Sequence, residues 1–454
     1  MQQNQQTITD PGSGAGADGA TAALEARGLF KVFGRRPDEV VRRLRSGADR
    51  DELAGQGTAA VIDASFEVRR GEIFVVMGLS GSGKSTLIRM LNGLQEPTDG
   101  EVLIDGSSIT KVSEAELRRV RRSSISMVFQ HFALLPHRTV LENVAYPLEI
   151  QGVPAAERRE RALVAVERAG LAGWHEKMPD ELSGGMRQRV GLARALAADT
   201  DIVLMDEAFS ALDPLIRREM QEQLIELQHE LGKTIVFITH DLNEAMFLGD
   251  RIAVMRDGRI VQIGTPEEIL TDPANDYVAQ FVQDVDRARV LTASAVMEPP
   301  RSVVTLAAGP RAALRTMRDL QTSAAFVVGG GRRLVGTVRD RDVIEQVRSS
   351  ATDLSAVVAS DVVTVGPDTA LSEIIEPAVE SALPVAVVDE AGRLLGAIPR
   401  VTLLAALGNV SSHTGEQPVV EPPATLSTEL VTATLHATGG PVDDAVLATE
   451  GGVR

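Results

Sequence analysis

The stretch Gly78-Leu-Ser-Gly-Ser-Gly-Lys-Ser-Thr86 sets the fold of the longer part of this chain. It follows an apolar run, Ile73–Met77, typical of a buried strand, and an amphipathic segment begins near Lys84. A loop of the form G-x-x-x-x-G-K-[ST] between a strand and a helix predicts a phosphate-binding site. The glycines let successive N–H groups point at one phosphate, and the helix N-terminus adds a partial positive charge. A Gly/Ser turn with a chance lysine is the competing interpretation, and the flanking strand and helix disfavour it.

We expect the whole loop to contribute to an ATP site. Lys84 should reach the β- and γ-phosphates, and Ser85 should place its hydroxyl on a Mg²⁺ ion. The other nucleotide-binding residues that we predict here are Gly78, Leu79, Ser80, Gly81, Ser82, Gly83 and Thr86.

An apolar strand that ends in two carboxylates lies further along, at Ile202-Val-Leu-Met-Asp206-Glu207. Burying acids at a strand end is costly unless a cation or a proton-transfer task accompanies them. We expect Asp206 to hold Mg²⁺, directly or through water, and Glu207 to polarise the attacking water as general base. A solvated acidic turn is the alternative for this stretch alone. Beside a phosphate loop, the catalytic interpretation is favoured.

From Leu29 to about Phe281 the sequence alternates apolar strands with amphipathic helices, which predicts an α/β domain with a largely parallel sheet. The expected strands are Ile73–Met77, Ser126–Phe129, Ile202–Met205, Thr234–Ile238 and Ile252–Met255. The expected helices begin near Lys84, Ala156, Gly185 and Pro214. Asp257-Gly258 reads as a hairpin turn. Residues 38–56 look inserted, and their apolar side chains fall on one helical face, which favours a surface helix over a membrane-facing one.

Composition narrows the class of protein. The chain has 454 residues, no cysteine and a net charge of −17, so disulfides and cysteine-bound metals are excluded and nucleic acid is not an expected partner. Its apolar runs are shorter than the roughly 18–20 residues that span a bilayer. The N-terminus has neither the basic start nor the apolar run of a signal peptide. We therefore expect a cytoplasmic protein that works at a membrane only through a spanning partner.

Two related stretches follow the α/β part. Ala324–Ile344 and Leu383–Leu404 each contain a strand, a Gly-containing turn, a second strand with the pattern R-L-x-G, and a helix, which is an internal repeat of about 60 residues. The predicted organisation is a disordered segment 1–22, an ATPase domain 23–285, repeats at 293–350 and 353–408, and a disordered acidic tail 409–454. The fold class is therefore α/β with a smaller α+β domain behind it.

Five motifs in order resemble the ABC transporter ATPase family over residues 27–283. Leu182-Ser-Gly-Gly-Met186-Arg-Gln188 is similar to the family's LSGGQ signature, with Met186 in place of the usual glutamine. The others are Gln130 for the Q-loop, Ser210-Ala-Leu-Asp213 for the D-loop, His240 for the switch histidine and Phe33 for the aromatic that stacks on adenine.

The resemblance implies roles for these residues. Ser183, Gly184 and Gly185 start a helix and can bind an anion through their N–H groups, which in this family is the γ-phosphate held by the other subunit. A head-to-tail homodimer with two sandwiched ATP molecules follows, with Asp213 also at the nucleotide.

Gln130 would contact Mg²⁺ and water and report their presence to the membrane partner. His240 would hydrogen-bond the γ-phosphate and orient the water. Taken alone, His240 reads as a satisfied strand-end histidine and Phe33 as a core residue.

Three stretches resemble one particular group within this family. They are MGLSGSGKSTLIRMLNGLQEPTDGEVLIDG, FALLPHRTVLENVAYPLE and the insert at residues 38–56. These stretches look like the ATPases of glycine betaine/proline betaine importers, which also carry two cystathionine-β-synthase-type (CBS) repeats. This implies an integral-membrane permease, an extracytoplasmic solute-binding protein and a place at the cytoplasmic face of the membrane. Import of another small solute, such as an amino acid, is the alternative. A soluble ABC ATPase of DNA repair or translation and a pure nucleotide sensor are less favoured, the first because the chain has neither long coiled-coil insertions nor a second cassette, the second because Glu207 and His240 are intact.

CBS pairs bind adenine nucleotides, and the family pattern ends in a glycine, a threonine and an aspartate at three-residue steps. The first repeat keeps Gly336 and Asp342 but has Arg339 in the middle, and the second keeps Gly396 alone. At most one half-site matches.

Charge also differs between the repeats. Residues 293–352 hold nine arginines against five acids, and residues 353–408 hold two against eight. Solvated faces that attract each other are one interpretation. A salt-screened regulatory contact with anionic lipid or with the partner subunit is the other. The residues that we expect to regulate, through salt or through a nucleotide effector, are Arg332, Arg333, Arg339, Arg341 and Asp342.

Overall fold

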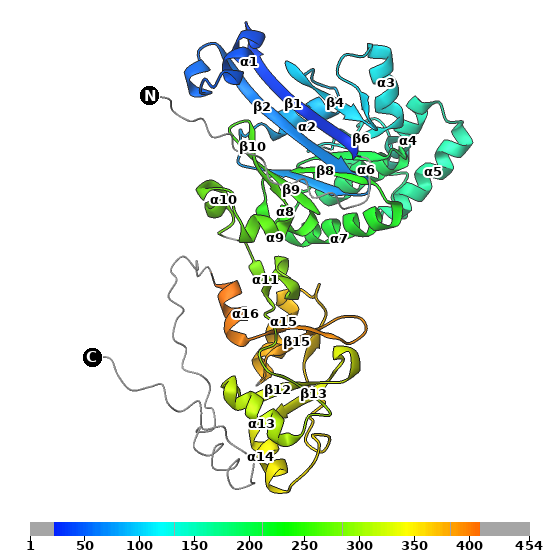
Figure 1. Cartoon of the computed structure of the whole chain (residues 1–454). Coiled ribbons are helices and arrows are strands. Elements are labelled where there is room, and N and C mark those ends of the chain that lie inside the picture. The colour runs from blue at the N-terminus through cyan, green and yellow to red at the C-terminus, as the bar shows by residue number, and fades with distance from the viewer. Residues whose placement is uncertain (1–21, 131, 211, 284, 382, 409–454) are drawn as a thin grey trace, which may run out of the picture. The chain divides into compact units, whose positions relative to one another are not determined.

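The computed structural model describes residues 22–130, 132–210, 212–283, 285–381 and 383–408. The chain divides after Val282 into two compact units (Figure 1). The first strand begins at Ala22, and the rest of the predicted N-terminal segment and the predicted acidic tail lie outside the described residues.

A six-stranded sheet forms the core of the first unit, in the order β10-β9-β3-β8-β7-β6. The strands from β9 to β6 run parallel and β10 pairs antiparallel with β9. Their bounds are β3 (Ile73–Met77), β6 (Ile125–Val128), β7 (Ile202–Asp206), β8 (Thr234–Thr239), β9 (Arg251–Arg256) and β10 (Arg259–Gly264). Strands covered on both faces are continuous apolar runs, which is why the sequence revealed them.

Helices cover this sheet. α2 (Lys84–Leu91) contacts β7 and β8, α8 (Leu242–Leu248) contacts β3 and β8, and α7 (Pro214–Leu231) contacts α8. The short helices α9 (Pro266–Thr271) and α10 (Asp276–Phe281) end the unit. The predicted hairpin at Asp257-Gly258 joins β9 to β10, with Asp257 at a left-handed φ of 51°.

A second, antiparallel sheet has the order β2-β1-β4-β5, with β1 (Ala22–Gly34), β2 (Gly57–Arg69), β4 (Asp99–Ile104) and β5 (Ser107–Ser108). The insert joins β1 to β2 and contains α1 (Pro37–Arg45) and the 3-10 turn η1 (Asp51–Leu53). Val40, Val41 and Leu44 are buried in one cluster with Phe30. The expected surface helix is confirmed, and its apolar face packs on the β1–β2 hairpin.

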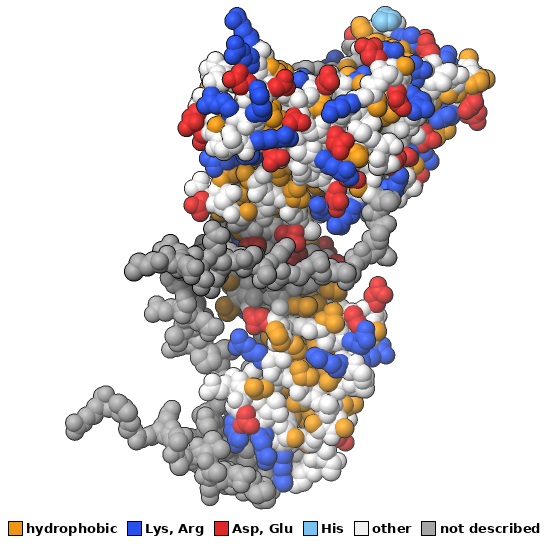
Figure 2. All heavy atoms as spheres, turned by 45° about the horizontal axis from the view of Figure 1, so that its top comes forward, with side chains coloured by type: hydrophobic (Ala, Val, Ile, Leu, Met, Phe, Trp, Pro, Cys, Tyr) orange, Lys and Arg blue, Asp and Glu red, His pale blue; other side chains and the backbone are white. Residues whose placement is uncertain are grey.

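A helical layer lies beside the core sheet and contains α3 (Glu114–Ser123), α4 (Val140–Gln151), α5 (Ala155–Arg168), η2 (Pro179–Glu181) and α6 (Gly184–Ala197) (Figure 1). α4, α5 and α6 share one apolar cluster that includes Val144, Val166 and Val190. Figure 2 shows acidic and basic side chains interspersed over the first unit, where pairs such as Arg118 with Glu114 are exposed and add little stability.

The second unit repeats one motif. In the first copy β12 (Ala324–Val328), β13 (Leu334–Arg339) and α14 (Asp340–Arg348) follow β11 (Val303–Thr305) and α13 (Pro310–Asp319). In the second, β15 (Val385–Val388), β16 (Leu394–Ile398) and α16 (Arg400–Leu407) follow β14 (Thr364–Val365) and α15 (Leu371–Glu380). Each copy has a three-stranded sheet with one parallel and one antiparallel pair. The predicted strand-turn-strand-helix repeat is therefore confirmed.

The two repeats meet through apolar and backbone contacts. Phe326 packs in one cluster with Ala386 and Leu394, and the Leu334 N–H donates to the Gly392 carbonyl at 2.9 Å. α11 (Arg287–Val290) precedes the first repeat and contacts α15 and α16 of the second, and α12 (Ala293–Val296), which opens the first repeat, contacts α16 and β16.

Candidate functional site

Four loops meet at one edge of the core sheet. The phosphate loop follows β3, Gln130 follows β6, Asp206 ends β7 with Glu207 after it, and His240 follows β8. These strands are parallel, so their carboxyl ends lie at the same edge, where open α/β sheets bind ligands. The topology therefore brings together residues that are up to about 160 positions apart in the sequence.

The phosphate loop needs glycine for two different reasons. A Cβ on Gly83 would lie 2.1 Å from the Ala60 carbonyl oxygen, and one on Gly78 would lie 2.2 Å from that of Met255, so backbone crowds both positions. Gly81 meets nothing within 4 Å, but its φ of +82° is unfavourable for other residues. The loop is thus held against β2 and β9 while Gly81 faces open space.

The loop has a buried cation and an unsatisfied hydroxyl. Lys84 is 5% exposed, and its Nζ donates to the carbonyl oxygens of Gly78 at 2.8 Å and Leu79 at 3.1 Å. Burial lowers the pKa of Lys84, against the opposing effect of Glu207 and Asp206. The buried hydroxyl of Ser82 has no hydrogen-bond partner among the described residues. An anion with several oxygens fits this arrangement.

The two acids occupy distinct environments. The Ser85 hydroxyl donates to Asp206 Oδ1 at 3.2 Å, and burial raises the pKa of Asp206. Glu207 adopts a left-handed φ of 46°, and its Oε2 accepts from Gln130 Nε2 at 3.0 Å and lies 3.3 Å from His240 Nδ1. The structure thus brings Glu207, Gln130 and His240 into one group and Ser85 with Asp206 into another.

The signature and D-loop residues suggested by the family resemblance lie at the starts of two helices. Ser183 caps α6 and accepts from the Met186 N–H at 3.3 Å, with Gly184 and Gly185 in the first turn behind it. Asp213 caps α7 and accepts from the Ile216 N–H at 3.2 Å. No hydrogen bond joins Ser183 or Asp213 to the phosphate loop within the described part of the chain.

Phe33 lies next to the last residue of β1, with its side chain exposed. Its relative exposure is 44%, and the Lys31 ammonium lies 5.4 Å from the centre of its ring. An exposed aromatic ring at a strand end offers a flat stacking surface. The interpretation of Phe33 as a core residue is therefore excluded.

Several polar residues near the site were not singled out from the sequence. Thr239 and Glu244 are buried and hydrogen-bond to each other, and Arg217 pairs with Asp241 at 3.0 Å. Arg194 donates to the backbone of Phe132 and Ala133, just after the Q-loop glutamine. The D-x-x-E spacing of Asp241 and Glu244 was the available signal, but it reads as a helix cap.

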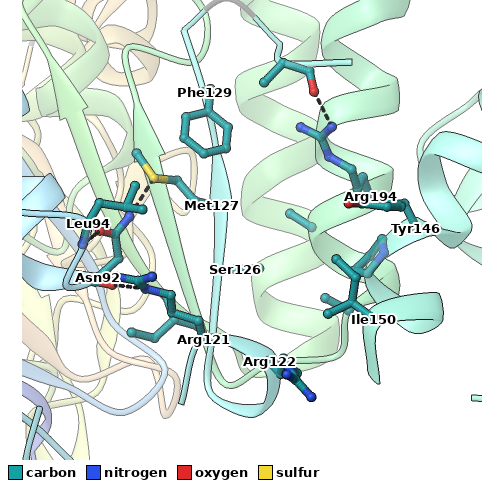
Figure 3. Close-up of a pocket in the computed structure, with 15 residues that line it drawn as sticks. Asn92, Leu94, Arg121, Arg122, Ser126, Met127, Phe129, Tyr146, Ile150 and Arg194 are labelled. Atoms are coloured by element: carbon teal, nitrogen blue, oxygen red, sulfur yellow. Dashed lines mark hydrogen bonds between the residues drawn. The ribbon is translucent and has the colours of Figure 1, made fainter. Parts of the chain in front are cut away.

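A cavity of about 360 Å³ lies between the core sheet and the helical layer (Figure 3). Figure 3 shows Arg194, Tyr146 and Ile150 on one wall, opposite Met127 and Leu94. The cavity was not predicted, because α3, α4, α6 and β6 all contribute to it and their packing is not visible in a single-sequence pattern.

The expected regulatory residues lie in the β12–β13 hairpin of the first repeat and at the start of α14. Arg332 and Arg333 lie in the turn between β12 and β13, and Arg339 ends β13 just before α14, with all three side chains exposed. Arg341 Nε lies 3.3 Å from Asp342 Oδ1.

The glycines that match the CBS pattern have a packing reason of their own. A Cβ on Gly336 would lie 2.3 Å from the Ala359 carbonyl oxygen, and one on Gly396 would lie 2.7 Å from Met297 Sδ.

No helix in the described ranges is long and apolar enough to cross a membrane.

Comparison with known proteins identifies the family. The ABC transporter profile matches residues 61–210, and the CBS domain profile matches residues 293–349 and 354–409. The chain is 51% identical to "Glycine betaine transport ATP-binding protein OpuAA" of Bacillus subtilis (strain 168), over 86% of this chain and 93% of that protein. It is 50% identical to "Glycine betaine/carnitine transport ATP-binding protein GbuA" of Listeria monocytogenes, over 85% of this chain and 97% of that protein.

A third relative, "Glycine betaine/proline betaine transport system ATP-binding protein ProV" of Salmonella typhimurium, is 48% identical over 86% of this chain and 99% of its own length. Identity over these lengths reaches past the ATP-binding unit into the CBS domains. The phosphate loop, the acidic strand end and His240 lie together at one edge of the core sheet. This chain belongs to the family of ABC transporter ATP-binding proteins, as a member with two C-terminal CBS domains whose relatives serve glycine betaine transport.

Proposed function

We propose that this chain hydrolyses ATP to energise import of glycine betaine, proline betaine or a related osmoprotectant through a membrane permease. The observation that carries the substrate class is the similarity to glycine betaine transport proteins, 48% to 51% identical over 86% of the chain. The chain would work at the cytoplasmic face of the membrane and receive solute indirectly, through an extracytoplasmic binding protein that delivers it to the permease.

In this proposal, hydrolysis is carried out by the group around Glu207 together with the phosphate loop. Glu207 accepts a proton from the attacking water as general base, while Gln130 and His240 hold its carboxylate in place through contacts of 3.0 and 3.3 Å. Lys84 and the N–H groups of the loop stabilise charge on the phosphate oxygens. The lysine is already held over the loop by two carbonyls, so it requires little reorganisation when the nucleotide binds.

The group formed by Ser85 and Asp206 fits a Mg²⁺ ion. The Ser85 hydroxyl and the Asp206 carboxylate are adjacent hard oxygen donors, and Gln130 offers an amide oxygen. No cluster of three or more His, Cys, Asp or Glu side chains suited to a metal occurs in the described ranges, so a magnesium ion here would share its shell with water and phosphate. When bound, the ion neutralises charge on the phosphates.

A second copy of the chain completes each site in this proposal. Ser183, Gly184 and Gly185 start α6, where the first N–H groups of a helix have no partner within the helix, and no hydrogen bond joins Ser183 to the phosphate loop in the described residues. Binding of a partner's γ-phosphate at this helix start, with Phe33 on the adenine, makes a head-to-tail dimer with two ATP molecules.

The cavity of Figure 3 offers the permease a docking site. Its walls combine apolar side chains, among them Leu94, Tyr146 and Ile150, with the guanidinium groups of Arg121 and Arg122. A short helix of the permease with an apolar side and an acidic end fits such a surface. The cavity also adjoins the segment after Gln130 through Ala133, so a permease helix docked there would lie close to the proposed catalytic group.

We further propose that the CBS repeats regulate transport. The exposed Arg332, Arg333 and Arg339 support a salt-sensitive contact with anionic lipid or with the partner subunit. A nucleotide effector at Arg339 and Asp342 is the competing mechanism, and it is weakened because backbone packing already explains Gly336.

The test of the chemistry is Glu207→Gln in the transporter reconstituted with its permease. We expect ATP binding and dimer formation to persist while hydrolysis falls by about 10²–10⁴-fold, the usual contribution of a general base. Turnover near the wild-type rate would remove Glu207 from that role. Stimulation of wild-type hydrolysis by an amino acid and not by glycine betaine would overturn the substrate class.

A further inference from the structure

A buried polar network lies behind the switch histidine, and the roles assigned so far do not use it. Glu244, on α8, is 4% exposed and lies among the buried residues of the core. One carboxylate oxygen accepts from the Thr239 hydroxyl and the other from Gln221 Nε2 at 3.1 Å. Thr239 and Gln221 are themselves 1% and 6% exposed, so water does not compete for these hydrogen bonds.

With Glu244 ionised, the hydrogen atoms of this network run in one direction. The Thr239 hydroxyl accepts from the Asp241 N–H at 2.9 Å, so its single proton remains for Glu244. His240 lies between Thr239 and Asp241, and the backbone on both its sides is therefore fixed by one hydroxyl. The carboxylate of Glu244 holds that hydroxyl in orientation.

The same network reaches α7, the helix that follows the D-loop. Arg217 and Gln221 stand one turn apart on α7, and both bond to the segment around His240, Arg217 to Asp241 and Gln221 to Glu244. Arg217 also donates to the Leu212 carbonyl at 3.1 Å, inside the D-loop. A movement of the D-loop would therefore reach the switch histidine through side chains that have few alternative partners.

We propose that Glu244 and Thr239 are positioning residues that hold His240 in its productive orientation and join it to the D-loop helix. The proposal rests on the role of His240 in the proposed function. Neither residue touches the nucleotide in this account. Losing either one should lower kcat for ATP hydrolysis and leave KM for ATP nearly unchanged, because the phosphate loop is intact.

The test is Thr239→Val, which keeps shape and removes only the hydroxyl. Leaving the buried carboxylate and the Asp241 N–H without their partner should reduce kcat about five- to thirtyfold. The matched control is Thr234→Val at the other end of the same strand, about 17 Å away, where the buried hydroxyl accepts from the Gly71 N–H at 3.0 Å. The control should lose stability and keep kcat within twofold.

The two variants are then repeated in a His240→Ala background. If Thr239 acts through His240, its effect on kcat should shrink below twofold there, because coupled residues are not additive. An equal loss in both backgrounds, or an equal loss from Thr234→Val, would overturn the proposal. A His240→Ala variant with normal turnover would instead refute the role of His240 in the proposed function, which separates the two failures.

An NMR measurement that does not depend on ATP turnover accompanies these assays. The chain has seven histidines, so ¹³C-labelled histidine spectra of the full chain can be assigned by the loss of one signal in His240→Ala. Thr239→Val should shift that signal and Thr234→Val should not. An unmoved signal would contradict the positioning role.

Substitutions at Glu244 test the hydrogen bonds that its carboxylate accepts from Thr239 and Gln221. Glu244→Gln should stay within threefold of the normal kcat, because the amide of Gln221 can turn round and satisfy it. Glu244→Leu should fall to the level of Thr239→Val. A loss in Glu244→Gln as large as in Glu244→Leu would show that the hydrogen bonds are not what matters.

Discussion

Arg194→Met removes a guanidinium that holds the segment after the Q-loop glutamine. Arg194, on α6, donates to the Ala133 carbonyl at 2.6 Å and to the Phe132 carbonyl at 2.7 Å. Both acceptors belong to left-handed residues, with φ of 47° and 61°, a conformation that costs free energy in residues other than glycine. The guanidinium gives up solvation to make these contacts, and this burial lowers the pKa of Arg194.

The loss of stability expected in Arg194→Met can be worked out from those two hydrogen bonds. A hydrogen bond from a charged donor contributes about 1.5–3 kcal/mol, so two lost bonds cost about 3–6 kcal/mol. Part of that cost is returned, because the methionine no longer buries a charge. We expect a net loss of roughly 2–4 kcal/mol in the free energy of unfolding of the first unit. For a unit of this size that is a fall of roughly 5–10 °C in its Tm.

The assay is thermal unfolding of the full chain, followed in the transition of the first unit, together with basal ATP hydrolysis. Arg194→Lys should be intermediate, since a lysine reaches one carbonyl at a time. Arg118→Met is the surface control, because its ion pair with Glu114 is exposed and should be worth less than about 1 kcal/mol. An Arg194→Met variant no less stable than Arg118→Met would refute this account of the Q-loop.

Three further predictions concern the nucleotide, the dimer and regulation. Lys84→Ala should weaken ATP binding as well as turnover, because it removes a point charge from the phosphates; unchanged affinity in a titration would show that the backbone N–H groups suffice. Ser183→Arg should abolish hydrolysis by filling the start of α6, and mixed dimers with Lys84→Ala should keep at most one working site; normal hydrolysis by Ser183→Arg would exclude the head-to-tail arrangement. Neutralising Arg332 and Arg333 should raise transport at low salt and flatten its salt dependence, since each charge near an anionic surface is worth about 1 kcal/mol and the attraction fades within about 8 Å at physiological salt. Asp342→Ala should remove only inhibition by a nucleotide, and an unchanged salt response after deletion of residues 293–454 would exclude both mechanisms.

The core strands and the phosphate loop were predictable because the pattern that marks them is local. β3 is apolar at every position and buried throughout, and the loop after it has a fixed spacing. The helix α4 was not assigned, because Pro147 lies inside it and proline usually ends a helix. Its start is instead fixed by the capping box of Thr139 and Glu142, and Asn143 is buried with hydrogen bonds to three backbone carbonyls.

The side chains that meet at the edge of the core sheet were predictable from motifs, but the hydrogen-bond network behind them was not. Asp241 and Glu244 have the spacing of a capping box, in which the glutamate would turn back to the helix start. Asp241 does cap α8, accepting from the N–H groups of Asn243 and Glu244. Glu244 turns inward instead, because Thr239 and Gln221 supply donors from β8 and α7. That choice depends on tertiary contacts, which no local spacing encodes.

In the proposed function, ATP hydrolysis at this site drives import of a quaternary amine. The direct measurement is uptake of labelled glycine betaine by vesicles that contain the chain, its permease and its binding protein, with ATP supplied on the side of the chain. We expect ATP-dependent accumulation that Glu207→Gln abolishes and that unlabelled proline betaine competes for, with no competition from a common amino acid. Accumulation that persists in Glu207→Gln, or uptake of the amino acid without uptake of glycine betaine, would contradict the account.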